Sequence, residues 1–106
     1  MGVPLFEVKV DSQLKLDLEG MLTVARGVGL IFLNNPNNPT ATVHSKADVT
    51  AFIEQVNRTS PDTTILVDEA YFEYVDAAGY GTVIPVAVQN PRVVVLRTFS
   101  KVFGMA

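Results

Sequence analysis

Three short, uninterrupted runs of apolar residues constrain the fold of this chain more than any other feature. They occupy residues 30–33, 65–67 and 93–96. Runs of this length, bounded by turn residues, are typical of parallel strands that are buried on both faces. Helical patterns precede the first run and separate it from the second, so the order includes strand, helix, strand. The sequence therefore predicts an α/β fold with a mainly parallel sheet.

Two segments have apolar residues at helical spacing. Residues 16–26 form the first, with Asp17 available as the N-cap and Gly27 as a stop. The second begins at Ser45, which is followed three residues later by an aspartate in a pattern similar to a capping box, and it ends near Arg58. The apolar face of this second helix consists of Val49, Phe52, Ile53 and Val56.

The remaining segments give weaker signals. Residues 5–10 alternate apolar and polar side chains, which predicts a strand with one face in water at the edge of the sheet. Glycines and a proline interrupt residues 72–88, so we expect a loop there with one short helix.

Length and composition set limits on the class of protein. With 106 residues, the chain is large enough for one core but too short to divide into two domains. It is 48% hydrophobic and 18% charged, which excludes a disordered tail. The same composition is rich in apolar residues for a free-standing domain, so we expect apolar surface that requires further partners.

Charge and residue usage argue against several functions. The net charge is −3 and the eight basic residues are scattered, so no Lys/Arg stripe for a nucleic acid is present. There is no cysteine and only one histidine, which argues against a metal site. No apolar run is long enough to cross a membrane, and no signal peptide is recognised at the N-terminus. We therefore expect a cytoplasmic protein.

Polar groups that could bind a cofactor follow each of the three apolar runs. Asn38 lies in the Asn-Pro loop after the first run, and Asp68 and Tyr71 follow the second. The turn after the third run contains three more such side chains, which are Thr98, Ser100 and Lys101. Ligands of open parallel sheets collect outside the carboxyl ends of the strands, so these groups are expected at one site.

The types of side chain point to pyridoxal phosphate. The amine of Lys101 can form a Schiff base when a desolvated site keeps it unprotonated. A carboxylate such as Asp68 can pair with a protonated ring nitrogen, and hydroxyl groups beside the lysine suit phosphate oxygens. Asn38 and Tyr71 can donate hydrogen bonds to a phenolate oxygen, where they tune electron withdrawal by the ring.

These residues resemble the class I/II aminotransferases of the type I pyridoxal-phosphate fold, and most closely the histidinol-phosphate aminotransferase branch. The resemblance rests on residues 35–40, 68–71 and 97–106, in the family's order and at similar intervals. It implies a partial three-layer α/β/α large domain. It also implies that Lys101 forms the Schiff base and later moves a proton, and that Asp68 binds the ring nitrogen.

The resemblance assigns the remaining site residues and the partners. It implies that Asn38 and Tyr71 donate to the ring oxygen and that Thr98 and Ser100 contact the phosphate. The expected substrates are a small-molecule amino donor and a 2-oxo acid, with a role in histidine biosynthesis, and the parent enzyme is expected to be a homodimer. The family's phosphate loop, ring-stacking aromatic residue and substrate-binding arginine fall outside the sequence, so residues 1–106 are interpreted as a fragment of the cofactor-binding large domain.

Two alternatives stay open. Residues 65–69 are similar to a Walker-B strand of an ATPase, although the chain lacks the G-x-x-x-x-G-K-[ST] loop that such an enzyme requires. The chain could also be an inactive or non-binding piece of an aminotransferase. Outside the candidate site, Glu69 is expected to face solvent, His44 to lie in a surface loop and Arg97 to donate a structural ion pair.

Overall fold

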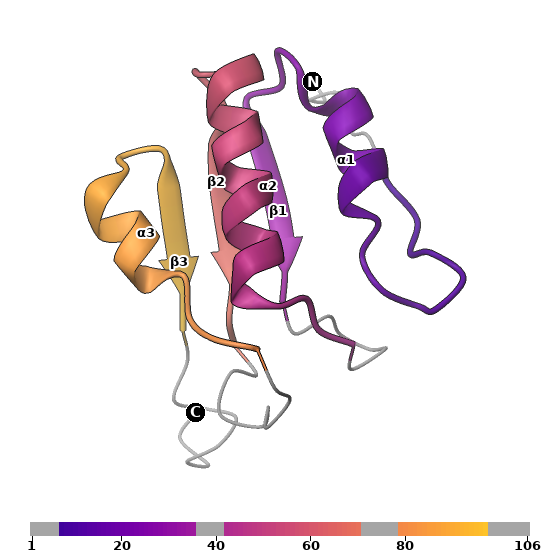
Figure 1. Cartoon of the computed structure of the whole chain (residues 1–106). Coiled ribbons are helices and arrows are strands. Elements are labelled where there is room, and N and C mark those ends of the chain that lie inside the picture. Colours follow the sequence, from indigo (N-terminus) through magenta and orange to yellow (C-terminus); the bar gives the residue numbers. More distant parts are fainter. Residues whose placement is uncertain (1–6, 36–41, 71–78, 98–106) are drawn as a thin grey trace.

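The computed structural model describes residues 7–35, 42–70 and 79–97, and within them three parallel strands form one sheet. β1 spans Leu30–Asn34, β2 spans Thr64–Asp68 and β3 spans Val93–Leu96. The sheet order is β1-β2-β3, and the three arrows point the same way in Figure 1. The strands and the parallel pairing predicted from the apolar runs are confirmed.

Among the described residues, three helices accompany the sheet: α1 at Leu18–Ala25, α2 at Lys46–Thr59 and α3 at Ile84–Gln89. Both predicted caps are confirmed, because the side chain of Asp17 accepts a hydrogen bond from Gly20 N at 3.0 Å and that of Ser45 accepts one from Asp48 N at 3.1 Å. The described part of the chain contains no helix with the length and apolar character needed to cross a bilayer.

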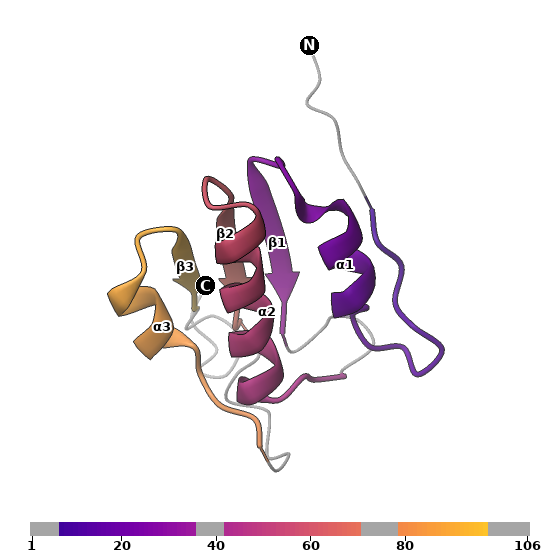
Figure 2. The ribbon, with the colours of Figure 1, turned by 45° about the horizontal axis from the view of Figure 1, so that its top comes forward.

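The core lies between the sheet and α2. The helix crosses one face of the sheet, with α1 and α3 on the same side of it (Figures 1 and 2). Every second strand residue points toward this layer because side chains alternate along a strand. The buried core residues are Ala25, Ile31, Leu33, Val49, Phe52, Ile53, Val56, Ile65, Val67, Val83 and Val93. The apolar face predicted for α2 is thus confirmed as its buried face.

The opposite face of the sheet is apolar and has no helix over it within the described residues. The register aligns Phe32 with Leu66 and Leu66 with Val94 on this face. Phe32 is 54% exposed and Leu30 is 57% exposed. The prediction that these strands are buried on both faces is therefore wrong for the described part of the chain, because all three described helices pack on the other side. We call this surface the open face of the sheet.

Residues 7–10 do not form the predicted edge strand, and Leu5 and Phe6 lie outside the described residues. The alternation that suggested a strand does occur in the burial, since Val8 and Val10 are half-buried while Glu7 and Lys9 are exposed. A strand also requires a hydrogen-bonded neighbour, and no described segment pairs with these residues. The alternation in the sequence therefore indicates which of these side chains are exposed and which are half-buried, but it does not indicate a strand.

The open face has a measurable consequence for the 106-residue chain in isolation. We expect it to self-associate, because contiguous exposed apolar surface is a site of aggregation. Replacing Leu30 and Phe32 together by threonine should lower the average mass seen by size-exclusion chromatography with light scattering. Val88→Thr, a change at an exposed apolar residue of α3, is the matched control and should leave the mass unchanged. A compact monomer that melts cooperatively would contradict the prediction.

Candidate functional site

The carboxyl ends of all three strands meet at one edge of the sheet and are held in register there. Asn34 aligns with Asp68, and Asp68 aligns with Leu96. Two backbone hydrogen bonds continue past the strands, from Asn35 N to the Asp68 carbonyl at 3.1 Å and from Glu69 N to the Leu96 carbonyl at 2.9 Å. Backbone hydrogen bonds therefore hold the three strands together at the edge where the polar residues begin.

Asp68 is the last residue of β2 and lies on the same side of the strand as Leu66, which is the open face of the sheet. It is half-buried, and its Oδ1 accepts a hydrogen bond from Ala70 N at 2.9 Å. This short-range contact fixes the carboxylate at the start of the segment that follows β2. Within the described part of the chain, no hydrogen bond reaches Oδ2.

The other predicted site residues lie outside the described residues; they are Asn38, Tyr71, Thr98, Ser100 and Lys101. The structure does place the residues from which their segments continue. The chain leaves the carboxyl edge after Asn35 from β1, after Ala70 from β2 and after Arg97 from β3. The three segments that contain the predicted groups thus begin at the edge where Asp68 lies.

The sequence-based prediction that Glu69 faces solvent is wrong. Its side chain is buried, with 2% of the residue exposed, and it accepts three hydrogen bonds. The donors are Thr82 Oγ1 at 2.8 Å, Val83 N at 3.0 Å and Arg97 Nε at 2.9 Å. Because side chains alternate in extended backbone, Glu69 points toward the helix-covered face while Asp68 points toward the open face. The predicted role of Arg97 as a structural ion-pair donor is confirmed.

Asn35 is a second residue whose importance the sequence did not reveal. It is 4% exposed, and its side-chain amide forms two hydrogen bonds with the backbone of His44. Nδ2 donates to the His44 carbonyl at 3.2 Å, and Oδ1 accepts from His44 N at 2.9 Å. The hydroxyl of Tyr80 donates to the Asn35 carbonyl at 3.1 Å. Asn35 therefore fixes both ends of the segment that contains Asn38.

Removal of the Asn35 side-chain amide should weaken the link between Asn35 and the backbone of His44. We expect Asn35→Ala to speed hydrogen exchange of the His44 amide by roughly tenfold or more, since a buried donor that loses its partner costs about 1–3 kcal/mol. Hydrogen exchange with mass spectrometry on a peptide that contains His44 measures the effect. Asn57→Ala, on α2, is the matched control and should leave this amide protected. If the His44 amide stayed equally protected in Asn35→Ala, the proposed role of Asn35 in holding His44 would be refuted.

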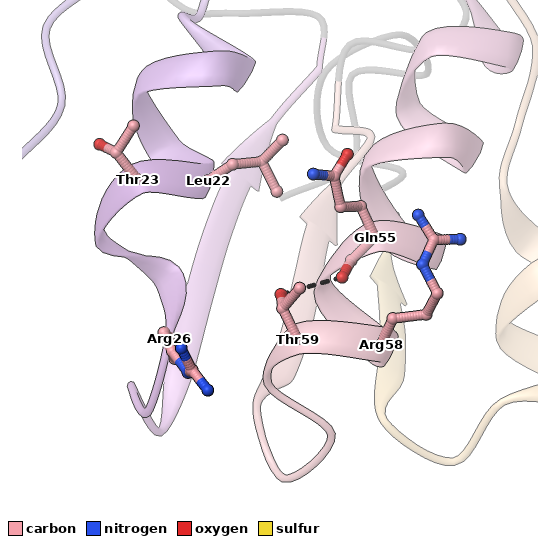
Figure 3. A pocket seen from close by; sticks show the side chains of 6 residues that line it. All are labelled: Leu22, Thr23, Arg26, Gln55, Arg58 and Thr59. Atoms are coloured by element: carbon pink, nitrogen blue, oxygen red, sulfur yellow. Dashed lines mark hydrogen bonds between the residues drawn. The ribbon is translucent and has the colours of Figure 1, made fainter.

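A cavity of about 420 Å³ lies between α1 and α2 (Figure 3). It is lined by Leu22, Thr23, Arg26, Gln55, Arg58 and Thr59. These residues come from the last turns of the two helices, near the edge where the strands begin. Thr59 Oγ1 donates to the Gln55 carbonyl at 3.0 Å. Asp68, the predicted site residue that the structure describes, does not line this cavity.

Comparison with known proteins decides the family. The model of class I and II aminotransferases matches residues 1–106, which is the whole chain. The chain belongs to the class I and II aminotransferase family. This confirms the resemblance seen in the sequence and leaves no support for the ATPase alternative.

The similar proteins include histidinol-phosphate aminotransferases from several bacteria. The chain is 41% identical over 106 residues to that of Anaeromyxobacter sp. (strain Fw109-5), covering 99% of this chain and 28% of that protein. It is 42% identical over 106 residues to that of Bacillus velezensis, covering 99% of this chain and 29% of that protein. The chain thus spans less than a third of the length of these relatives.

Solved structures share the fold of this chain. The crystal structure of histidinol-phosphate aminotransferase from Sinorhizobium meliloti in complex with pyridoxal-5'-phosphate has a TM-score of 0.81 at 29% identity, and the match covers 96% of this chain and 27% of that one. Cystalysin from Treponema denticola has a TM-score of 0.71 at 18% identity, covering 92% of this chain and 25% of that one. The α/β class and the parallel sheet predicted from the sequence are confirmed.

Proposed function

We propose that residues 1–106 form the central segment of the large domain of a pyridoxal-phosphate-dependent aminotransferase. The family match over the whole chain and the histidinol-phosphate aminotransferases among its relatives support this proposal. The proposed reaction transfers an amino group from an amino donor such as histidinol phosphate to a 2-oxo acid.

The observation that carries the proposal is the position of Asp68. Its carboxylate lies at the carboxyl edge of a parallel sheet, where α/β proteins bind their ligands, and Oδ2 has no hydrogen bond within the described residues. A carboxylate at such an edge suits the protonated ring nitrogen of pyridoxal phosphate. Asp68, which the structure describes, therefore supports the proposal; the other proposed site residues lie outside the described residues.

Each of the other site residues has a defined task in the proposal. The bound cofactor supplies an electron-withdrawing ring that stabilises negative charge on the substrate carbon. Lys101 would hold the cofactor covalently, and its free amine would move a proton to or from that carbon. The hydroxyl groups of Thr98 and Ser100 bind the phosphate. Asn38 and Tyr71 donate hydrogen bonds to the ring oxygen.

The proposal extends to the protein that carries this segment. By family resemblance, the complete enzyme is a homodimer that works in the cytoplasm in histidine biosynthesis. The isolated chain is proposed to be inactive, because it spans under a third of its relatives and because one apolar face of its sheet has no helix over it within the described residues. The complete enzyme and the isolated 106-residue chain are different molecules, and each is tested separately.

An assay of the full-length protein tests the proposed reaction. With pyridoxal phosphate and 2-oxoglutarate present, histidinol phosphate should yield glutamate faster than phenylalanine does at equal concentration. A preference for phenylalanine would contradict the proposed donor and keep the reaction class. Release of carbon dioxide from a phosphorylated amino acid, without glutamate, would contradict transamination itself.

A further inference from the structure

The Glu69 carboxylate joins three parts of the chain that are far apart in sequence. It follows β2, and it accepts hydrogen bonds from Thr82 and Val83 just before α3 and from Arg97 just after β3. The two carboxylate oxygens share these donors, since Oε1 accepts from Thr82 Oγ1 and Arg97 Nε while Oε2 accepts from Val83 N. Glu69 itself is almost completely buried, so its carboxylate depends on these donors in place of water.

Glu69 also contacts the end of β3 through its backbone. Its N–H donates to the Leu96 carbonyl at 2.9 Å, and its side chain binds the Arg97 guanidinium at 2.9 Å. One residue thus ties the end of β2 to two successive residues at the end of β3. In the sequence, Arg97 immediately precedes Thr98 and stands four positions before Lys101.

Because Glu69 is next to Asp68, its contact with Arg97 also influences the direction of the Asp68 side chain. The two side chains point to opposite faces of the sheet, so a rotation of the backbone that moved one would also move the other. Fixing Glu69 on the helix-covered side therefore fixes the direction of the Asp68 carboxylate on the open face. The same residue binds Arg97, which is the last described residue before Thr98.

We infer that Glu69 is a positioning residue, which sets the placement of Asp68 relative to the Lys101 segment by binding Arg97, Thr82 and Val83. This inference rests on the proposed function, because it assigns the purpose of the contact to cofactor binding. The ion pair joins the buried Glu69 to an Arg97 side chain that is 31% exposed, and such a pair is weak evidence for stability. Fixed geometry at a binding site is a better reason for its presence.

The test compares Glu69→Gln with Glu54→Gln in the full-length protein. Both changes remove one carboxylate, but Glu54 is exposed on α2 and serves as the matched control. We measure the Kd for pyridoxal phosphate by titration, the pH midpoint of the absorbance of the bound cofactor, and the melting temperature of the cofactor-free protein. Glu69→Gln should raise the Kd by roughly 10- to 100-fold, as loss of an orienting outer partner does at other ligand sites, and should move the pH midpoint. Glu54→Gln should change neither.

A purely structural role gives a different result. In that case Glu69→Gln lowers the melting temperature while the Kd and the pH midpoint stay at their original values, and the inference is overturned. If Glu69→Gln does not fold, Arg97→Lys provides the second variant, because it keeps the positive charge and removes the Nε donor. It should raise the Kd, and an unchanged Kd would overturn the inference equally.

Failure of the proposed function is visible without any variant. If the unaltered full-length protein binds no pyridoxal phosphate at Lys101, the proposed function fails first and the positioning role fails with it. If the unaltered protein binds the cofactor there and the Glu69 and Arg97 variants bind it equally well, only the positioning role fails.

Discussion

Lys101→Ala in the full-length enzyme is expected to reduce transamination by about 10⁴-fold or more, the upper end of what one positioned acid-base group contributes. The loss is large because the proposal gives this amine two tasks, covalent attachment of the cofactor and proton transfer at the substrate carbon. Glutamate formation at saturating pyridoxal phosphate measures it.

Two further variants separate the chemistry of the amine from its charge. Lys101→Arg keeps a positive charge but has no amine able to attach the cofactor, so it should be as inactive as Lys101→Ala. Lys9→Ala, at an exposed lysine before α1, is the control for loss of a lysine and should retain full activity. If Lys101→Ala kept more than about a hundredth of the original turnover, the amine could not hold the role proposed for it.

Asp68→Ala is expected to reduce turnover by roughly 10²- to 10³-fold, similar to the removal of one preorganised electrostatic contact elsewhere. Without the carboxylate, the protonated ring nitrogen loses its partner and the ring withdraws electrons less strongly. Lys101 is unchanged in this variant, so cofactor should still be trapped on it by borohydride. Turnover and trapping are measured on the same preparation.

The control for Asp68→Ala is Asp62→Ala. Asp62 lies in the turn before β2, at the opposite end of the same strand, and its side chain is fully exposed. Its removal takes away the same charge and leaves the candidate site intact, so turnover should not change. Unchanged turnover in Asp68→Ala itself would refute the ring-nitrogen role.

The sequence alone predicted most of the fold because the relevant signals are local. The apolar runs at residues 30–33, 65–67 and 93–96 identified all three described strands, and the caps Asp17 and Ser45 located the starts of α1 and α2. The failure at residues 7–10 has a physical reason. Alternating burial can arise in any extended segment, whereas a strand also depends on a neighbour distant in sequence.

The candidate site was harder to predict because burial depends on the whole fold. Asp68 and Glu69 are adjacent acidic residues, and nothing local tells which one lies on the open face of the sheet and which one is buried. The three donors to Glu69 are 13, 14 and 28 positions away, so its burial follows from the meeting of β2, β3 and the start of α3. Asn35 is similar, because its partner His44 lies across a nine-residue separation.

Covalent attachment of pyridoxal phosphate to Lys101 can be tested directly. The full-length protein is incubated with the cofactor, reduced with borohydride and digested, and the labelled peptide is sequenced by mass spectrometry. We expect the pyridoxyl group on Lys101 and on no other lysine in the saturated enzyme. A label on a different residue, or an enzyme that is active without any label, would contradict the proposed role of Lys101.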